Sequence, residues 1–347
     1  MHALLSDVGY MRVWERELRE AGATVHCRPL IPLRHRPLRF VGSILDRAQS
    51  GRIAEYCREV APEGIVVNQQ YDEDGLDYLT GARMTGVPYC GVMHMPMTRE
   101  KNLRFLGRLR GALLRRWFRQ NEYRLVFVSH GAQLEFEAYY PAPRPTFVIN
   151  NSIPLTAARV PLPRPVWDDA VPVVGFIGQF VPQKNLFFLI DGWLRASASG
   201  HSSRLMLVGD GPQRIALERY LRDRAAPDSW YITGWTTTPK RYAANIDLFL
   251  LVSHFEGLSL SLLEFVAEGK PALIASVNGT SDVTRRAPWV RQTSNACVEV
   301  YARDLGIALE AMRVSDRPAA ADLKSFQAHF SLPRMAQETL SVLGLET

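Results

Sequence analysis

One stretch of the sequence, residues 247–276, constrains the fold more than any other. An apolar run at 247–252 is followed by a loop, a helical segment and a second apolar run at 272–275. Short apolar runs bounded by turn residues are typical of buried strands, and Gly269 and Pro271 are typical of the end of a helix. The stretch therefore predicts a parallel β-α-β unit, whose loop and helix N-terminus lie at the carboxyl edge of a sheet.

The loop and helix of this unit hold two carboxylates beside a predicted anion site. Ser259 or Ser261 can cap the helix, and the unpaired N–H groups at a helix N-terminus favour a phosphate. Glu256 precedes the helix and Glu264 lies inside it, with seven residues between them. Because carboxylates repel phosphate, these acids are better explained as acceptors for sugar and ribose hydroxyls, which indicates a nucleotide-sugar. Alternatively, Glu264 only complements the helix dipole and Glu256 is a solvated loop acid.

Length and composition limit the class of protein. The chain has 347 residues, 47% of them apolar, which is enough for two domains with cores of their own. The net charge of +6 suits an anionic substrate, a membrane surface or nucleic acid. Four scattered cysteines without a Cys-x-x-Cys pair argue against zinc and disulfides and favour the cytoplasm. We expect no signal peptide, and no apolar run reaches the roughly 18 residues of a membrane span.

Apolar runs and helical periodicity alternate along both halves of the chain. Strands are predicted at 1–6, 24–30, 64–68, 88–93, 124–129, 147–149, 173–177, 204–208, 230–233 and near Val290, in addition to the unit described above. Helices are predicted at 10–21, 44–60, 72–85, 99–122, 131–139, 185–198, 213–225, 240–245, 297–313, 319–329 and 333–343. This alternation predicts α/β domains with doubly wound parallel sheets.

A proline-rich segment separates the two halves. Five prolines fall between residues 154 and 172, in a region without apolar periodicity. We therefore predict an N-terminal Rossmann-like domain at 1–155, a linker at 156–172 and a C-terminal nucleotide-sugar-binding domain at 173–330. The last helix, in 331–347, is expected to pack back toward the first domain. Two such domains predict a cleft between them, where small-molecule sites are common.

Five segments in order along the chain resemble the motifs of one known family. They are 148–153 (VINNSI), 175–185 (GFIGQF…KN), 208–212 (VGDGP), 233–235 (TGW) and 256–264 (EGL…LE). Together they resemble the group 1 (family 4) retaining glycosyltransferases of GT-B fold, and 91–94 and 126–129 also fit. The resemblance implies a nucleotide-diphosphate sugar as donor, retention of anomeric configuration, and no cofactor or metal.

The same resemblance implies roles for single residues. Glu264 would receive the ribose hydroxyls and Glu256 a hydroxyl of the donor sugar, while Lys184 would stabilise the charge on the leaving phosphate. His94, after a strand of the first domain, would reach the donor, although a lone histidine is more often structural. The catalytic candidates are thus Glu256, His94 and Lys184. The donor-binding candidates are Gly178, Gln179, Lys184, Gly209, Trp235, Gly257, Leu258, Ser259, Leu260, Ser261 and Glu264.

Two departures from the family pattern stand out. Gln179 occupies the position of the usual phosphate-loop arginine, so that Lys184 is the one cation of that loop. Residues 1–6 look like the second strand of the pattern, so the first β-α unit of the N-terminal domain is expected to be missing. Both departures leave open a catalytically impaired GT-B module that binds nucleotide or glycan without turnover. An epimerase of double-Rossmann architecture is a further alternative, which the motif order fits poorly.

Two other features have competing explanations. Asp72-Glu73-Asp74 has the form of a metal-binding Asp-x-Asp, but helix capping and dipole interactions explain it better. The basic helical stretch 99–122 can lie on anionic lipid, or it can be a solvated face over a core stripe. Its charged members are Lys101, Arg104, Arg108, Arg110, Arg115, Arg116 and Arg119, and its large apolar members are Phe105, Leu109, Leu113, Trp117 and Phe118. No motif for reading nucleic acid accompanies the charge.

The sequence therefore predicts a bacterial hexosyltransferase (EC 2.4) of cell-surface polysaccharide or glycolipid synthesis. It would transfer a sugar to a glycan or a lipid-linked acceptor. We expect it in the cytoplasm, with possible peripheral contact with the inner membrane face and no nucleic-acid partner.

Overall fold

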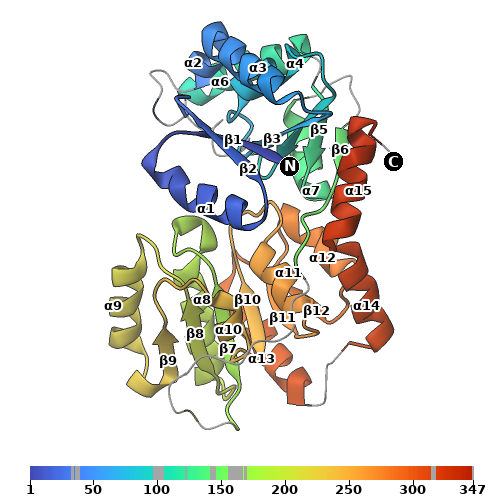
Figure 1. Ribbon diagram of the computed structural model, residues 1–347. Coiled ribbons are helices and arrows are strands. Elements are labelled where there is room, and N and C mark those ends of the chain that lie inside the picture. The colour runs from blue at the N-terminus through green and yellow to red at the C-terminus, as the bar shows by residue number, and fades with distance from the viewer. Residues whose placement is uncertain are drawn as a thin grey trace. The chain divides into compact units, whose positions relative to one another are not determined.

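A computed structural model describes residues 1–32, 35, 40–96, 105–121, 123–140, 146–154, 167, 170–313 and 318–345 (Figure 1). The chain forms two compact units. The first contains Met1–Phe127, Phe136–Phe147 and Glu338–Thr347, and the second contains Val128–Glu135 and Val148–Gln337. Most of the predicted linker lies outside the described residues. The predicted cleft between two domains stays a prediction.

The first unit contains two parallel sheets. β1 (His2–Ser6) pairs with β2 (Thr24–Arg28), and a separate four-stranded sheet has the order β3-β4-β5-β6. The strands of that sheet are β3 (Ile65–Gln69), β4 (Tyr89–Met93), β5 (Leu125–Phe127) and β6 (Thr146–Val148). The helices are α1 (Arg12–Glu20), α2 (Phe40–Leu45), α3 (Arg47–Val60), α4 (Leu76–Arg83), α6 (Phe105–Gln120) and α7 (His130–Tyr139), the last beginning in the second unit.

Two predicted helices of this unit begin or break at a different place. The helix predicted at 44–60 is divided into α2 and α3, because Asp46 caps α3 by accepting a hydrogen bond from Gln49 N at 2.9 Å. The helix predicted at 72–85 begins only at Leu76, since Gly75 in front of it has a φ of 64°. A side-chain cap in the first case and a backbone conformation in the second, rather than the apolar pattern, decide where the helix starts.

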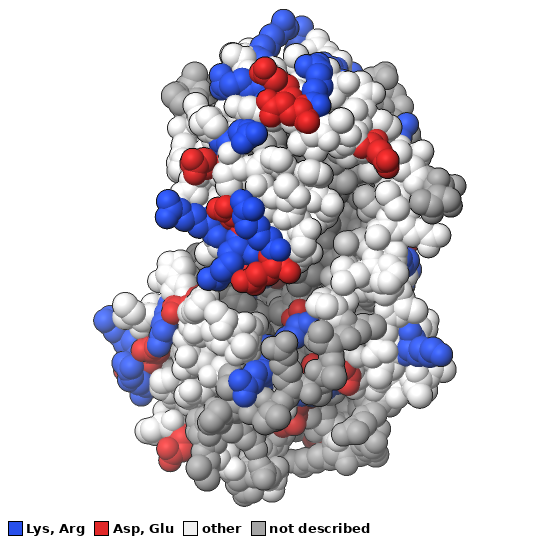
Figure 2. All heavy atoms as spheres, in the orientation of Figure 1, with Lys and Arg blue, Asp and Glu red and all other residues white. Residues whose placement is uncertain are grey.

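Charges of both signs alternate on α1. Arg19 Nη2 lies 3.0 Å from Glu15 Oε1, and Arg16 Nε lies 4.0 Å from Glu20 Oε1, both pairs four residues apart. Figure 2 shows basic and acidic side chains interspersed on this face of the first unit. The three arginines and three glutamates of α1 therefore offset one another. At the end of the chain, Val342 O accepts a hydrogen bond from Arg124 Nη1 at 2.7 Å, both in the first unit.

The second unit is a doubly wound α/β domain. Its six strands pair in parallel in the order β12-β11-β10-β7-β8-β9. They are β7 (Val173–Ile177), β8 (Arg204–Val208), β9 (Trp230–Ile232), β10 (Leu248–Leu251), β11 (Ala272–Ala275) and β12 (Val290–Thr293). The strand order reverses between β7 and β10, and in such sheets ligands bind beside the carboxyl ends of the strands at this reversal.

Helices cover this sheet, and its central strands are buried throughout (Figure 1). The helices of this unit are α8 (Leu186–Ala198), α9 (Arg214–Arg224), α10 (Pro239–Ala243), α11 (Leu260–Val266), α12 (Ser281–Thr284), α13 (Val298–Arg313), α14 (Ala320–His329) and α15 (Leu332–Leu343), whose end belongs to the first unit. α8 packs on α13, where the ring of Phe188 stacks on that of Tyr301 with centroids 5.5 Å apart. Burial on both faces of the sheet explains why the sequences of these strands are continuous apolar runs. Among the described residues, none of the helices has the length and apolar character needed to cross a lipid bilayer.

Candidate functional site

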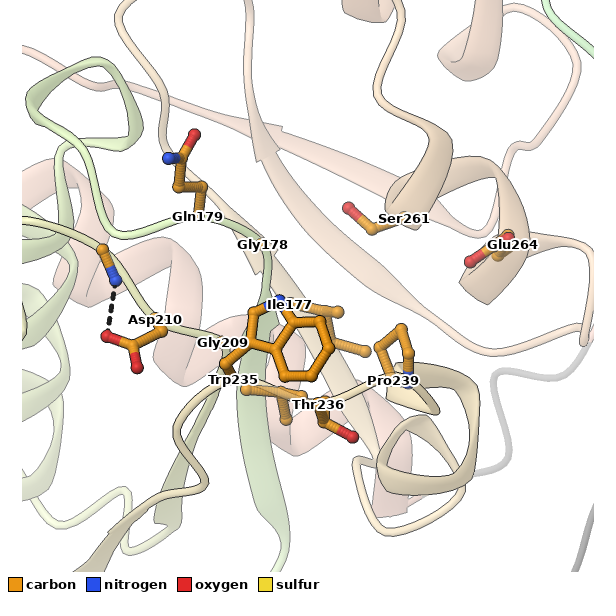
Figure 3. Close-up of a pocket in the computed structure, with 12 residues that line it drawn as sticks. Ile177, Gly178, Gln179, Gly209, Asp210, Trp235, Thr236, Pro239, Ser261 and Glu264 are labelled. Carbon is orange, nitrogen blue, oxygen red and sulfur yellow. Dashed lines mark hydrogen bonds between the residues drawn. The ribbon is translucent and has the colours of Figure 1, made fainter. Parts of the chain in front are cut away.

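A pocket of about 690 Å³ lies at the carboxyl ends of β7 and β8 in the second unit (Figure 3). Its lining residues come from the ends of β7 and β8, from the loops after β7, β8 and β9, and from α10 and α11. They are Ile177, Gly178, Gln179, Val208, Gly209, Asp210, Gly211, Trp235, Thr236, Pro239, Ser261 and Glu264. Six of the predicted donor-binding residues are among them: Gly178, Gln179, Gly209, Trp235, Ser261 and Glu264. The pocket thus brings together segments that the sequence separates by more than 80 residues.

Direct backbone contact between two loops shapes one wall of the pocket. Gly178 N donates a hydrogen bond to Val208 O at 3.0 Å. Gly209 has a φ of +140°, and a Cβ placed on it would lie 1.9 Å from Gly178 O. A side chain at this position is therefore excluded both by the backbone conformation and by space. The glycine lets the β8 loop approach the phosphate-loop segment closely.

Lys184 and Glu256, both predicted catalytic residues, form an ion pair. Lys184 ends a 3₁₀ turn (Pro182–Lys184) that follows β7, and its Nζ lies 2.7 Å from Glu256 Oε1. The side chains are 18% and 6% exposed, so water screens their attraction only weakly. Glu256 is not among the residues that line the pocket.

Polar side chains hold the loop that carries Glu256. The five donors are Gln183, Asn185, Asn295, Ser129 and Asn151. They bond to the carbonyl oxygens of Phe255 (2.9 Å), Val252 (3.3 Å), Ser253 (2.8 Å), Gly257 (2.7 Å) and Leu258 (3.4 Å), respectively. Because its carbonyls are bonded to side chains from distant segments, this loop has a defined backbone despite lacking regular structure. Of these donors, all but Asn295 lie within the segments that resemble family motifs, and none was predicted to have this role.

Glu264 lies on α11 and has a basic neighbour of its own. Ser259 caps this helix, since its Oγ accepts from Leu262 N at 3.4 Å, while Ser261 lines the pocket. The Glu264 Oε1 atom lies 3.1 Å from Lys240 Nζ, with the two side chains 28% and 32% exposed. In Figure 3, Glu264 and Ser261 come from the same helix and border the same side of the pocket. Of the other predicted residues, Gly257, Leu258 and Ser259 are buried and Leu260 is exposed, and these four are not lining residues.

The opposite side of the pocket carries an acid that the sequence did not single out. Asp210 Oδ1 accepts from Gly211 N at 2.7 Å, and its Oδ2 accepts from Arg214 Nη1 at 2.9 Å. These two donors lower the pKa of Asp210 below its ordinary value, so it is ionised at neutral pH. Gln179 is exposed at this end of the pocket, and no lysine or arginine is among the twelve lining residues.

Trp235 gives the pocket an apolar surface. Its side chain is 75% exposed, although tryptophan is usually well buried. The turn before it is fixed by a bridge between Gly209 and Gly234 and by a hydrogen bond of 3.2 Å from Gly209 N to Thr233 Oγ1. An exposed indole beside a pocket is suited to stack on a flat ring.

His94 lies in the first unit, directly after β4. Its Nε2 is 2.6 Å from Asn68 Oδ1, at the end of the neighbouring strand β3. Burial lowers the pKa of His94, which favours the neutral ring. The predicted role of His94 next to the donor stays a prediction, since Lys184 and Glu256 belong to the second unit.

The capping explanation of Asp72-Glu73-Asp74 is wrong. Gly75, not one of the acids, is the N-cap of α4, and it makes no side-chain cap bond. Asp72 Oδ2 instead accepts from Tyr140 OH at 2.6 Å, and Glu73 pairs with Arg110. Among the residues that the structure describes, no three His, Cys, Asp or Glu side chains form a group that could hold a metal.

The basic stretch 99–122 forms α6, with its first six residues outside the described part. Trp117 and Phe118 are buried, which confirms the core stripe that was one of the two explanations. Leu109 and Leu113 are 61% and 42% exposed, and Arg116 and Arg119 are also exposed. Nothing is described of Lys101 and Arg104 or of the side chains of Phe105 and Arg108.

Comparisons with known proteins agree with this architecture. Residues 171–303 match the group 1 glycosyl transferases. The chain is 32% identical over 163 residues to the lipopolysaccharide core biosynthesis glycosyltransferase LpsD of Rhizobium meliloti, covering 47% of this chain and 43% of the relative. It is 32% identical over 127 residues to granule-bound starch synthase 2 of Solanum tuberosum, 35% of this chain and 16% of that protein. The chain thus spans less than half the length of these curated relatives.

Solved structures match nearly the whole chain. HepE of Anabaena in complex with UDP superposes with a TM-score of 0.75 at 14% identity, over 99% of this chain and 92% of that one. Sucrose-phosphate synthase of Thermosynechococcus elongatus superposes with a TM-score of 0.69 at 16% identity, over 99% and 98%. At such identities the likeness concerns the fold alone. The segment 171–303 is thus similar to the group 1 glycosyl transferases, and the whole chain has the GT-B fold.

Proposed function

We propose that the protein is a retaining glycosyltransferase that transfers a sugar from a nucleoside-diphosphate donor to a glycan or lipid-linked acceptor. The observation that carries the proposal is the ion pair between Lys184 and Glu256, at 2.7 Å, in the same unit as a pocket that Glu264 lines. Relatives named for lipopolysaccharide core and Vi polysaccharide biosynthesis support a role in cell-surface polysaccharide or glycolipid synthesis.

Lys184 supplies positive charge for the leaving group in this proposal. Cleavage of the bond between sugar and diphosphate leaves negative charge on phosphate oxygens, and a preorganised cation stabilises it. An ammonium group has three N–H donors, so Lys184 can keep its bond to Glu256 and still donate to phosphate. Gln179 adds amide hydrogen-bond donors but no charge.

The two glutamates accept hydroxyl groups. Glu256 accepts from the donor sugar near the reacting carbon, and Glu264 accepts from the ribose. Trp235 offers its exposed face to the base. The family resemblance supports displacement on one face of the sugar, assisted by the leaving phosphate, without a metal ion.

Helix α6 of the first unit supports the proposed acceptor and place of action. Leu109 and Leu113 lie one helical turn apart and are exposed, with Arg116 and Arg119 on the same helix. A helix that combines exposed leucines with arginines suits an anionic lipid surface. We propose that the protein works in the cytoplasm, with peripheral contact with the inner membrane face, where lipid-linked acceptors occur.

A donor panel tests the proposed function. Purified protein is incubated with UDP-, GDP- and ADP-glucose, and release of the nucleoside diphosphate is measured together with binding. We expect turnover of one donor, insensitive to a metal chelator. Glu256→Gln should lower kcat by about 100-fold or more, because it removes a charge beside the reacting group. The matched control Glu310→Gln, on a side chain 63% exposed on α13, should leave turnover unchanged.

The second candidate function has a different outcome in the same experiment. Gln179, in place of the family's arginine, favours a module that binds a nucleotide or glycan without turnover. Binding of a donor without turnover would support that module and contradict the transferase. If the protein neither binds nor turns over any donor of the panel, the nucleotide-sugar interpretation is wrong.

A further inference from the structure

α10 places Lys240 beside the pocket, and this lysine belongs to none of the family motifs. Pro239, the first residue of α10, lines the pocket, and Lys240 follows it. Lys240 Nζ lies 3.1 Å from Glu264 Oε1, and both side chains are about one-third exposed, at 32% and 28%. In Figure 3, Pro239 and Glu264 lie at one end of the pocket, with Gln179 and Asp210 at the other.

Each carboxylate in and beside this pocket has a cation next to it, although Arg214 also pairs with Glu218 at 2.9 Å. Asp210 is paired with Arg214 at 2.9 Å and Glu264 with Lys240 at 3.1 Å, and Glu256 has Lys184 at 2.7 Å. The two lining acids would otherwise repel a diphosphate, since no basic residue lines the pocket. A neighbouring cation reduces this repulsion while the carboxylate keeps its capacity to accept hydrogen bonds.

We infer that Lys240 is a positioning residue that holds the Glu264 carboxylate in the orientation needed to bind the ribose of a nucleoside diphosphate. The inference rests on the proposed function and concerns a residue outside the family motifs. Lys240 engages Oε1, and among the described residues no donor is bonded to Oε2. A carboxylate has about four acceptor directions, so Oε2 and the remaining direction of Oε1 can meet ribose hydroxyls. Without the lysine, this ion pair no longer restrains the side-chain torsions of Glu264.

The test compares ribose with deoxyribose rather than activity alone. UDP, GDP and ADP are titrated into the wild-type protein by calorimetry, and the one that binds is compared with its 2′-deoxy form. A hydrogen bond to a charged group predicts a preference for the ribonucleotide of about 10-fold or more. Lys240→Met should reduce that preference to about 3-fold or less, by weakening the ribonucleotide while the deoxynucleotide changes by less than about 2-fold.

Three further variants test whether the loss of ribose preference is specific to the pair of Lys240 and Glu264. Lys240→Arg keeps a cation and should retain most of the preference. Lys324→Met removes a positive charge from an exposed site on α14 and should change neither affinity. In a Glu264→Gln background, Lys240→Met should have no further effect on the preference, because the carboxylate that it positions is gone. Thermal melts of all variants show whether each one is folded.

Two outcomes would overturn the inference. If Lys240→Met weakens both nucleotides by the same factor, the lysine contacts the diphosphate or supports the fold instead. If the preference for ribose does not change, the ion pair has no part in ribose recognition. Failure of the wild-type protein to bind any of the three diphosphates is a different result, which contradicts the proposed function and the inference together.

Discussion

Among the acid–base pairs of the second unit, the one between Lys184 and Glu256 is the least exposed. Its side chains are 18% and 6% exposed, whereas those of Arg214 and Asp210 are 37% and 35% exposed. Exposed pairs contribute little to stability because water screens them, but loss of one partner from a buried pair leaves a charge uncompensated. The Lys184–Glu256 pair is therefore the one whose removal should affect both stability and chemistry.

Substitution of Lys184 separates these two effects. Lys184→Met should lower the unfolding free energy by about 2 kcal/mol, because the Glu256 carboxylate then lacks its cation in a poorly solvated site. The double variant Lys184→Met/Glu256→Gln removes both charges and should regain most of that loss. Turnover should stay low in both variants. Urea denaturation and initial rates measure the two quantities, and a double variant as unstable as the single one would contradict the assignment.

Gly209 provides a second prediction at the level of single residues. Gly209→Ala places a methyl group 1.9 Å from Gly178 O at a φ of +140°. Gly200→Ala is the matched control, since its φ is +93° but nothing lies within 4 Å of the added Cβ. We expect a loss of about 3 kcal/mol or more at position 209 and about 1 kcal/mol at position 200, measured by urea denaturation. Equal losses would mean that the two loops are not in direct contact.

The end of α14 holds the segment that follows β6. His329 Nε2 lies 2.9 Å from Asn150 Oδ1, and Phe330 O accepts from Ile153 N at 3.0 Å. Arg334 Nη1 lies 3.0 Å from His329 Nδ1. Arg334 Nη1 also lies 2.8 Å from His329 Nε2. Because a guanidinium only donates hydrogen bonds, a ring nitrogen must accept and the ring is neutral. Burial and the neighbouring positive charge of Arg334 lower the pKa of His329 from 6.5 to about 4.

This histidine makes the stability of the second unit dependent on pH. Between pH 4 and 6.5 the unfolded state binds more protons at His329 than the folded state, so stability rises with pH and is lost as pH falls through this window. Discounted for partial exposure, the contribution is about 1–2 kcal/mol. His329→Gln should flatten the dependence of unfolding free energy on pH, and exposed His254→Gln should not. Parallel curves for His329→Gln and wild type would contradict this.

At the scale of the whole molecule, the donor-binding candidates all lie in the second unit, whereas the catalytic candidate His94 lies in the first. A nucleoside diphosphate at 100 times its Kd should stabilise the folded protein by about 2.7 kcal/mol. Hydrogen exchange should slow mainly in segments 174–185, 206–214 and 253–264, because these carry the pocket and the Lys184–Glu256 pair. Helices α3 and α4 of the first unit serve as internal controls. Protection confined to the first unit would contradict the placement of the donor.

The positions of strands and motifs could be predicted because they depend on local patterns. The predicted strands at 173–177, 204–208 and 272–275 agree with β7, β8 and β11, whose residues are almost entirely buried and apolar. The family pattern indicated Lys184 and Glu256 as separate site residues, and their ion pair was found only in the structure. Helix starts were less predictable. Asp46 acts through a side-chain cap and Gly75 through its backbone conformation, and apolar periodicity reports neither.

The sequence by itself determined the α/β class and the two-part organisation, and it predicted Lys184, Glu256 and Glu264 as site residues, because periodicity and motif spacing are properties of neighbouring residues. Only the tertiary structure decided which polar groups meet. Ser129 and Asn295 bond to the loop of Glu256, and Lys240 pairs with Glu264, across separations in the chain that no local pattern encodes. Such partners are set by the packing of helices and loops on a sheet, where distant segments satisfy the buried polar groups of one another.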